Sequence, residues 1–460
     1  MKFTDTITAI STAFGNAGIA IVRISGNKSL PILKKIFKAK DDKNKFETHK
    51  LIYGKILDKK SETIDEVLSV YFKKPNTYTM EDIIEIQCHG GYITANIILK
   101  RILEEGVRMA KPGEFTERAF LSGRIDLTQA EAVLDIIHAK TEKAQKIAEN
   151  QLQGSLKKKI KSILDYLLNI YTQILANIDF PDEDTPEITK KEIEKKITKP
   201  IKEIEEILSG AATGTIYKEG LKVAIVGLPN VGKSSILNSL VKDARAIVTD
   251  IPGTTRDILE DQIEIRGLLV RLFDTAGITS TEDKIEKEGI KRSLKAIKNA
   301  DLLLFVIENN NDIEKFMSHL KPEVKGQFKN KQIILIKNKI DLYKKKTSIK
   351  DIFGMKIIKI CECSAKTGKG IREIENTIFN EIQKNEADES ILITNVRHQK
   401  LLDKSLKNLK KAKELARAQE PEDKILIEFD EANKALGEII GEITTDDILD
   451  KIFSMFCIGK

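Results

Sequence analysis

Apolar and polar positions divide the chain into segments with different periodicities. Residues 18–25 and 83–87 have the apolar, β-branched composition of strands, and glycine-containing turns punctuate the region around them. From Phe115 to about residue 210, apolar residues recur every three or four positions, which predicts long helices. Two prolines and four acidic residues at 179–186 predict a loop within this helical region. We therefore expect an α+β domain followed by a helical domain.

A second change of pattern begins at Leu221. From there to about residue 380, short apolar runs alternate with helical stretches, which predicts a doubly wound α/β domain. Helical spacing then returns and continues to Lys460, so the simplest organisation is one helical domain split by an insertion. The runs expected to form strands of the inserted domain are 221–226, 268–273, 302–307 and 333–336. The expected domains are residues 1–118, 119–216, 217–380 and 381–460, of which the second and fourth form the helical domain.

The composition indicates a globular protein with several domains. At 460 residues the chain exceeds one ordinary core, and about 150 residues per domain predicts roughly three domains. No apolar run approaches the roughly 18 residues of a membrane span, so we expect a cytoplasmic protein. The four cysteines form no Cys-x-x-Cys pair and are expected to be reduced thiols. The formal charge of +7 permits a polyanionic partner without requiring one.

Residues 227–235 form a phosphate-binding motif directly after the strand expected at 221–226. They read Gly-Leu-Pro-Asn-Val-Gly-Lys-Ser-Ser, and the glycines allow backbone N–H groups to turn toward a β-phosphate. Lys233 is expected to reach the β- and γ-phosphates, and the Ser234 hydroxyl to bind Mg²⁺. The chain is therefore predicted to bind a nucleoside triphosphate.

Motifs further along the chain favour guanine over adenine. They read Gly-Thr-Thr-Arg-Asp at 253–257, Asp-Thr-Ala-Gly at 274–277, Asn-Lys-Ile-Asp at 338–341 and Ser-Ala-Lys at 364–366. Asp341 can accept two hydrogen bonds that guanine donates and adenine cannot, and each buried unpaired partner would cost about 1–3 kcal/mol. Asn338 is expected at the Hoogsteen edge of the base, and the N–H groups of 364–365 near O6. The order of the motifs predicts GTP as the nucleotide.

Two departures from Ras-type switches bear on hydrolysis. Ile278 stands where those proteins usually place a glutamine that orients the attacking water, so another group must orient it. The carboxylates of 282–286 are candidates, although such a run more often begins a solvated charged helix. Asn230 places a side-chain carbonyl beside the phosphates, where a monovalent cation could supply charge as an arginine finger does. An arginine finger supplied by a partner is worth about 10³–10⁵ in rate.

The motifs together resemble those of the MnmE (TrmE) family of tRNA modification GTPases. The resemblance rests on 227–235, on 253–257 and on the terminal Phe-Cys-Ile-Gly-Lys at 456–460, and it extends to 18–26, 111–120 and 126–132. It implies a folate-binding N-terminal domain that also forms a homodimer, a split helical domain and an inserted G domain. The G domains of such a dimer would meet across their switch faces when GTP and K⁺ are bound.

The resemblance also implies roles for individual residues of the GTPase. Glu286 is expected to orient the attacking water. K⁺ is expected at Asn230, Thr249, Thr254 and the backbone carbonyl of Ile251, and Mg²⁺ at Ser234 and Thr255. The motifs and the resemblance together predict that GTP is bound by Asn230, Val231, Gly232, Lys233, Ser234, Ser235, Thr249, Asp250, Ile251, Pro252, Gly253, Thr254, Thr255, Asp274, Thr275, Ala276, Gly277, Asn338, Lys339, Asp341, Ser364, Ala365 and Lys366.

For the folate site, the resemblance implies Arg23, Glu85, Arg124 and Lys460 as ligands of 5-formyl- or methylene-tetrahydrofolate. Family members often have lysine at the position of Arg124, which keeps the positive charge. From the residues alone, Arg23 and Glu85 would be surface or ion-pair residues on amphipathic strands. Cys457 has two interpretations: a buried structural thiol, or a catalytic cysteine close to the one-carbon chemistry.

The resulting prediction is a homodimeric, K⁺-stimulated GTP hydrolase that forms a heterotetramer with an MnmG-like FAD protein. Together they would form the C5 aminomethyl-type modification of wobble uridine, U34, in certain tRNAs. One alternative is a GTP-dependent switch in ribosome assembly, a class that shares the motifs at 227–235 and 253–257 but usually carries an RNA-binding module in place of the cysteine-containing tail. A second is a folate-binding carrier whose GTPase is only regulatory.

Overall fold

The computed structural model divides into two compact units. Unit 1 comprises residues 1–134, 151–169 and 430–460, and unit 2 comprises residues 135–150 and 170–429. The residues that the structure describes are 4–13, 15–41, 46–179, 188–243, 245–246, 260–274, 296–318, 320, 325–326, 328, 331–342, 355–383 and 392–460. The loop expected at 179–186 therefore lies, after Asp179, outside the described residues.

A seven-stranded sheet forms the centre of unit 1, with strand order β3-β4-β5-β6-β2-β1-β7. Neighbouring strands are antiparallel, except that β1 and β7 are parallel. The register places Arg23 of β2 directly opposite Glu85 of β6. The strands are β1 Ile7–Ile10, β2 Ile19–Ser25, β3 Phe37–Ala39, β4 Leu51–Leu57, β5 Thr63–Phe72, β6 Ile83–His89 and β7 Arg108–Met109.

Side chains alternate along β2, and this alternation separates the core from the site described below. Val22 and Ile24 are fully buried in a cluster with residues of α1 (Ser29–Ile36) and α2 (Tyr92–Leu103). Because successive side chains of a strand point to opposite faces, Arg23 lies on the other face of the sheet. A charged residue between two core positions therefore needs partners on that second face.

The helices on the C-terminal side of unit 1 form a second core. Helix α3 spans Glu114–Leu121, α4 spans Leu127–His138 and α16 spans Asp446–Phe453. Their buried residues are Ala119, Ile125, Leu127, Ala130, Leu449, Ile452, Phe453 and Phe456. This cluster joins α16, near the end of the chain, to α3, which directly follows the N-terminal sheet. The remaining helices with residues in unit 1 are α5 Glu142–Leu152, α6 Ser155–Asp179 and α15 Glu422–Ile440.

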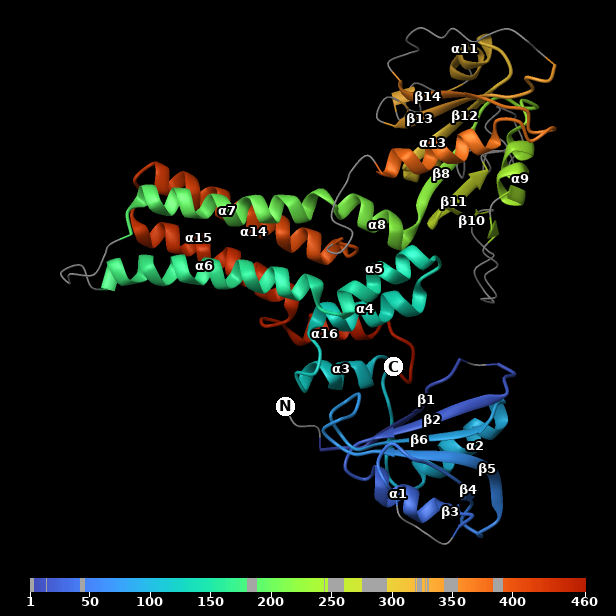
Figure 1. The fold of residues 1–460 in the computed structure, drawn as a ribbon, viewed down its shortest axis with the longest axis vertical. Helices are drawn as coiled ribbons and strands as arrows, with labels where there is room; N and C mark the ends of the chain where they lie inside the picture. The colour runs from blue at the N-terminus through green and yellow to red at the C-terminus, as the bar shows by residue number, and fades with distance from the viewer. Residues whose placement is uncertain are drawn as a thin grey trace. The chain divides into compact units, whose positions relative to one another are not determined.

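Unit 2 contains a second seven-stranded sheet, with strand order β14-β13-β12-β8-β11-β10-β9 (Figure 1). Strands β8, β11, β12, β13 and β14 are parallel, and β10 and β9 extend one edge in antiparallel pairing. All six residues of β12 are buried and alternate between two apolar clusters, as expected for a strand covered on both faces. The strands are β8 Leu221–Val226, β9 Arg245–Ala246, β10 Glu260–Ile265, β11 Leu268–Asp274, β12 Leu302–Ile307, β13 Gln332–Lys337 and β14 Lys356–Glu362.

Helices of two kinds accompany this sheet in unit 2. Helices α7 and α14 lie side by side (Figure 1), and α8 follows α7 and leads directly into β8. The others follow individual strands. Among the described residues, no helix is long and apolar enough to cross a membrane. The helices are α7 Lys190–Ser209, α8 Ala211–Glu219, α9 Lys233–Asp243, α11 Asn311–Ser318, α13 Ile371–Gln383 and α14 Val396–Arg417.

Candidate functional site

The P-loop motif connects the end of β8 to the start of α9. Backbone N–H groups at a helix N-terminus have no partner within the helix and point toward the loop, which favours an anion there. The Lys233 ammonium lies over the loop and donates hydrogen bonds to the carbonyls of Gly227 at 3.1 Å and Leu228 at 2.9 Å. Ser234 and Ser235 are exposed in the first turn of α9. The loop thus presents an ammonium, two hydroxyls and a helix N-terminus at one place.

Gly232 shows why this loop requires glycine. Its φ is +96°, and a Cβ built on it would lie 2.2 Å from Nδ2 of Asn338. That nitrogen donates a hydrogen bond to the carbonyl of Val231 at 3.0 Å. Any side chain at position 232 would displace the asparagine and strain the backbone. The P-loop and the loop after β13 are therefore built in direct contact.

Asn338 also holds the third loop of the nucleotide site. Its Oδ1 accepts a hydrogen bond from the N–H of Ala365 at 3.0 Å and a longer one from the Cys363 thiol at 3.7 Å. The side chain is 3% exposed. Asn338 thus joins three loops that follow parallel strands of one sheet, and its predicted contact with the Hoogsteen edge of guanine stays a prediction.

The predicted guanine-recognition residues lie at the same edge of the sheet. Asp341 and Lys366 are exposed there. A hydrogen bond from Ser364 lowers the pKa of Asp341, and the nearby positive charges of Lys366 and Lys339 act in the same direction. The carboxyl group is therefore ionised at neutral pH, as it must be to accept two hydrogen bonds from one base.

Sequence reasoning did not find the partner of Lys339. The Nζ of Lys339 lies 2.8 Å from Oε2 of Glu308, which directly follows β12. The backbone φ of Lys339 is +62°. The N–H groups of Glu308 and Asn309 are in turn capped by the buried carboxylate of Asp312. The position of Glu308 at a strand end was the one available signal, because that is where this sheet carries its other functional residues.

Several predicted residues lie outside the described part of the chain. The backbone of Asp274 is described, at the end of β11 and opposite Ile225 of β8. The side chain of Asn230 is exposed at the tip of the P-loop, where φ is +63°. The predicted residues outside the described part are Thr249, Asp250, Ile251, Pro252, Gly253, Thr254, Thr255, Thr275, Ala276, Gly277 and Glu286.

A second candidate site lies in unit 1, on the face of the sheet that carries Arg23. The Arg23 guanidinium forms a two-pronged contact with Oε1 of Glu85, at 2.9 Å from Nε and 2.8 Å from the terminal nitrogen. Its other side stacks over the Phe115 ring, 5.5 Å from the centroid. Both charged side chains are less than one-fifth exposed. The pair is thus held by the register of β2 and β6 and by α3.

The C-terminal tail completes this arrangement. The Gly459 carbonyl accepts a hydrogen bond from Arg23 at 3.4 Å, and the Lys460 carbonyl accepts one from the N–H of Phe115 at 3.1 Å. Gly459 has φ +98°, and a Cβ on it would lie 2.3 Å from the carbonyl oxygen of Ile10. Because no other residue fits so close to β1, the tail is seated against the sheet at a defined position.

A hollow of about 630 Å³ lies beside Glu85. Arg124 borders it, and its guanidinium stacks over the ring of Tyr78 at 4.9 Å from the centroid. The Tyr78 hydroxyl lies 3.0 Å from the Thr116 hydroxyl of α3. The walls combine aromatic faces with one carboxylate and one guanidinium, and the complete lining is His49, Phe72, Pro75, Asn76, Thr77, Tyr78, Met80, Glu85, Gly123 and Arg124.

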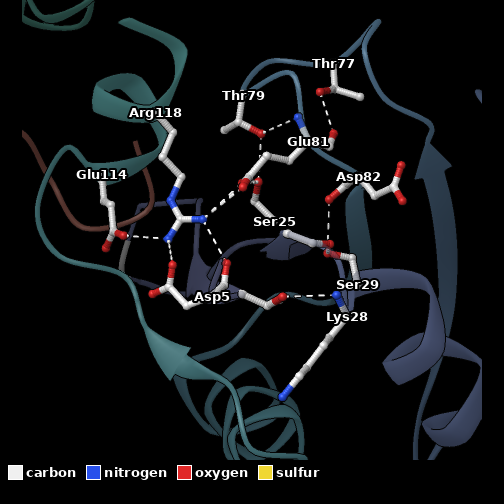
Figure 2. A network of polar contacts seen from close by, with 12 residues as sticks. Asp5, Ser25, Lys28, Ser29, Thr77, Thr79, Glu81, Asp82, Glu114 and Arg118 are labelled. Atoms are coloured by element: carbon white, nitrogen blue, oxygen red, sulfur yellow. Dashed lines mark hydrogen bonds and ion pairs between the residues drawn. The ribbon is translucent and has the colours of Figure 1, made fainter. Parts of the chain in front are cut away.

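A buried ion network fixes the loop that forms one wall of this hollow. Figure 2 shows Arg118 of α3 between the carboxylates of Asp5, Glu81 and Glu114, at 2.9, 3.1 and 2.9 Å. Glu81 also accepts a hydrogen bond from the Ser25 hydroxyl of β2 at 2.8 Å. Because Glu81 ends the segment 75–81, the network ties that segment to both α3 and the sheet.

The arginines of the network lower the pKa values of two of its carboxyl groups. Burial by itself would raise the pKa of Glu114, but hydrogen bonds from Arg108, from the Lys111 N–H and from Arg118 lower it to about 2. For Asp5, burial again acts upward, and the charges of Arg118 and Arg108 hold its pKa below the usual value. The carboxylates of Asp5 and Glu114 therefore remain ionised at neutral pH, and they compensate the charge of the fully buried Arg118.

The structure brings together most of the predicted folate ligands and separates the two interpretations of Cys457. Arg23 pairs with Glu85 and donates to the carbonyl of Gly459, which directly precedes Lys460, and Arg124 lies with Glu85 at the hollow. Cys457 is exposed, so its interpretation as a buried structural thiol is wrong. Its carbonyl accepts hydrogen bonds from the N–H groups of Gly113 and Lys460, both at 3.4 Å.

Comparison with known protein families identifies the chain. The MnmE helical domain matches residues 127–457, and the N-terminus of the GTP-binding protein TrmE matches residues 6–124. The chain belongs to the MnmE family. The family and the multidomain α/β architecture predicted from the sequence are thereby confirmed.

Relatives of full length support the same assignment to the MnmE family. The protein named tRNA modification GTPase MnmE from Thermoanaerobacter pseudethanolicus is 45% identical over 463 residues, which cover 99% of each chain. The protein of the same name from Alkaliphilus oremlandii is 44% identical over 467 residues, covering 100% of both. Among solved structures, the G domain of the T. maritima FeoB iron transporter is 26% identical, with a TM-score of 0.26 over 35% of this chain and 97% of its own.

Proposed function

We propose that the chain is a K⁺-stimulated GTP hydrolase that works with an MnmG-like flavoprotein to form the C5 aminomethyl-type modification of U34 in certain tRNAs, with a one-carbon folate as carbon source. As a member of the MnmE family, it is a GTPase involved in tRNA modification. The finer statements concern the folate, the ions, the partner protein and the position that is modified. Each rests on a particular part of the molecule.

The placement of the C-terminal tail carries the proposal. A GTP-dependent switch needs only the P-loop and its neighbouring loops, all of which lie in unit 2. In unit 1, residues 459 and 460 are fastened to Arg23 and Phe115 beside the hollow bordered by Glu85. A tail held at a defined place beside a hollow with aromatic and charged walls is unexplained by a switch and supports a second ligand site.

The residues of this site fit a reduced folate. A pterin ring carries an amine and ring N–H groups, and a carboxylate such as Glu85 can accept hydrogen bonds from them. The flat face of the ring suits a wall with Tyr78 and Phe72. The anionic glutamate moiety matches Arg124 and the ammonium of Lys460. The hollow of about 630 Å³ is within the usual size range of ligand pockets. When bound, the folate would supply a one-carbon unit at the oxidation level of formaldehyde or formate.

The nucleotide site is proposed to act by charge compensation and positioning. Lys233 would neutralise the β- and γ-phosphates, and Asp341 would select guanine through two hydrogen bonds. Ser234 and Thr255 would hold Mg²⁺, and Asn230 with Thr249, Ile251 and Thr254 would hold K⁺. The oxygen donors of these residue types suit such hard cations. Glu286 would orient the attacking water in place of the missing glutamine.

The assembly is also part of the proposal. We infer a cytoplasmic homodimer formed through the N-terminal domain, which joins the flavoprotein in a heterotetramer and binds tRNA. The domains are taken as residues 1–118, 119–216, 217–380 and 381–460. Closing of paired G domains during hydrolysis would be transmitted through the helical domain to the folate and tRNA site.

Mass spectrometry of nucleosides from bulk tRNA tests the function directly. The gene is deleted in its native cell and restored as wild type, as Cys457→Ser or as Cys457→Ala. We expect a C5-substituted wobble uridine to disappear on deletion and to return with wild type only. If the modification persists after deletion, the proposed function is wrong and a GTP switch in another RNA process replaces it. If Cys457→Ser restores it fully, the catalytic role of Cys457 falls while the rest stands.

A Lys233→Ala variant separates the proposal from a folate carrier with a regulatory GTPase. Because Lys233 compensates phosphate charge in unit 2, the variant should lose GTP hydrolysis roughly 100-fold or more while its affinity for 5-formyl-tetrahydrofolate is unchanged. Under the proposed function it also abolishes the wobble modification in cells. Survival of the modification in that variant would favour the carrier.

A further inference from the structure

We propose that the outward face of α14 is an RNA-binding surface that contacts the phosphate backbone of the tRNA substrate. The inference deepens the proposed function and rests on its tRNA substrate. It concerns the exposed residues Lys400, Lys404 and Lys407, called the lysine stripe below. None of these residues belongs to the nucleotide site or to the folate site.

The stripe follows from helical geometry. Its members are spaced by four and then three residues, so they lie above one another along one side of the helix. All three are exposed. The buried residues of α14 lie on the opposite side, and they are His398, Leu402, Ser405, Leu409, Ala412 and Ala416. At about 1.5 Å of rise per residue the Cα atoms of the stripe follow each other at about 4.5–6 Å along the helix axis, comparable with neighbouring phosphates along a nucleic acid strand.

The helix as a whole has an unusual charge balance. It contains eight Lys or Arg residues and two Asp or Glu residues, in a chain whose formal charge is only +7 over 460 residues. Helix α15, which follows it along the chain, contains six acidic and two basic residues. The positive charge is thus concentrated on α14. The acidic residues of this helix are Asp403 and Glu414, and both are exposed.

Two further lysines of α14 form ion pairs with neighbouring helices, and one of them, Lys411, follows Lys407 by four residues and continues the side of the stripe. Lys410 lies 2.7 Å from Glu205 of α7, and Lys411 lies 2.5 Å from Glu428 of α15. These pairs join α14 to its neighbouring helices. They hold the helix as a rigid support, and a rigid row of charges loses less conformational entropy on binding than a flexible tail does.

Helix α7 lies beside α14 and contains six lysines and five glutamates, so its own charge is nearly balanced. Four exposed lysines occur at spacings of four, four and three residues on its own outward side: Lys191, Lys195, Lys199 and Lys202.

The chemistry of the face favours RNA over a membrane. A helix that binds an anionic membrane surface needs an apolar side to insert among the lipids next to its basic residues. In α14 the apolar residues between the basic ones, such as Leu402 and Leu409, are fully buried in the protein. The exposed side of α14 carries the lysine stripe together with Asp403 and Glu414, and its excess of ammonium groups suits phosphates that carry charge at regular intervals.

Binding of an unmodified tRNA transcript with uridine at the wobble position tests the stripe. The full-length protein and the triple variant Lys400→Gln, Lys404→Gln, Lys407→Gln are titrated with the transcript at 50 to 200 mM KCl. Loss of three phosphate contacts should weaken binding roughly tenfold or more at 100 mM salt. It should also make the fall of log K with log salt less steep, by about 2–3 in slope. The matched control replaces the exposed Lys34, Lys38 and Lys60 of unit 1 by Gln and should change neither quantity.

Two further measurements complete the test. GTP hydrolysis without RNA should stay within about twofold of wild type in both variants, because the substituted lysines are exposed and outside the nucleotide site. Vesicles containing phosphatidylserine should not bind the wild type. The proposal would be overturned if the triple variant bound the transcript with the affinity and salt slope of the wild type. It would also be overturned if the control variant lost as much affinity as the triple variant. A third contrary outcome would be a wild type that binds the vesicles and a triple variant that loses vesicle binding but keeps RNA binding. The nucleoside analysis judges the proposed function separately, since the stripe can fail while the wobble modification still depends on the chain.

Discussion

The nucleotide site of unit 2 and the tail site of unit 1 are assembled in opposite ways. The described loops of the nucleotide site are short motifs that follow the parallel strands β8, β13 and β14 of one sheet. The tail site takes single residues from β2, β6, the segment after α3 and the last two positions of the chain. In the first, local sequence carries the chemistry, because parallel strands all end at one edge. In the second, the chemistry depends on which distant segments pack together.

This difference predicts where perturbations will act. A change at the nucleotide site should affect catalysis or nucleotide affinity alone. A change in the buried network or the tail should affect folate binding and the local stability of unit 1 and leave GTP hydrolysis intact. Three experiments test the separation, from the largest expected effect to the smallest.

Glu286→Ala should slow GTP hydrolysis by roughly 10²–10³, because the attacking water loses the carboxylate that orients it. GTP affinity should remain within about twofold. Single-turnover hydrolysis and equilibrium binding of a fluorescent GTP analogue measure the two quantities. Glu282→Ala, in the same acidic run, is the matched control and should hydrolyse GTP at the wild-type rate. A large loss of affinity with little change in rate would contradict the assigned role.

Glu114→Gln should destabilise the region around α3 by about 3 kcal/mol at neutral pH, because the native pKa of about 2 lies below the ordinary 4.5. A lowered carboxyl pKa contributes stability that is complete above about pH 4.5 and is lost as the pH falls toward 2. The difference between wild type and variant should therefore shrink as the pH falls from 5 to 3. Hydrogen exchange of α3 and of the segment 75–81 measures it.

The control for this experiment is Glu117→Gln on the same helix. Burial is the largest influence on Glu117 and raises its pKa, so removing that charge should not destabilise α3. Exchange of α9 in unit 2 should be unchanged in both variants. A difference between wild type and Glu114→Gln that stays constant from pH 7 to pH 3 would show that the ionised carboxylate does not stabilise the network.

Gly459→Ala should weaken binding of 5-formyl-tetrahydrofolate by roughly tenfold, because the added Cβ would meet the Ile10 carbonyl at 2.3 Å and the left-handed backbone would be strained. Calorimetric titration measures the affinity, and GTP hydrolysis should be unaffected. Gly18→Ala in the same domain is the matched control, since no atom lies within 4 Å of a Cβ built there. Full folate affinity in the Gly459 variant would remove the tail from the site.

The sequence was sufficient for the nucleotide site as far as local motifs extend. Glycine at 232 could be assigned to the P-loop from spacing alone, since the motif is contiguous. The same reasoning could not show that Gly232 is packed against Asn338, more than a hundred residues later, or that Lys339 pairs with Glu308. Those contacts depend on strand order, and strand order is not encoded in any one short segment.

For the tail site, sequence alone left Arg23 and Glu85 as ordinary residues of amphipathic strands, and only the family resemblance singled them out. The antiparallel register of β2 and β6 made them a pair, and the packing of α16 on α3 brought the last residues of the chain to them. The segment 75–81 and Arg118 gave no signal in the periodicity, since their roles lie in a network built from four separate parts of unit 1.

By itself, the sequence determined the succession of strands and helices along the chain, the nucleotide chemistry and the family. Each of these depends on residues close together along the chain. Tertiary structure decided that Cys457 is exposed, that the tail is fastened to β1 and β2, and that Arg118 is buried among three carboxylates. The physical reason is that burial, desolvation and ion pairing depend on neighbours in space. Those neighbours are chosen by the packing of whole elements, which no single segment specifies.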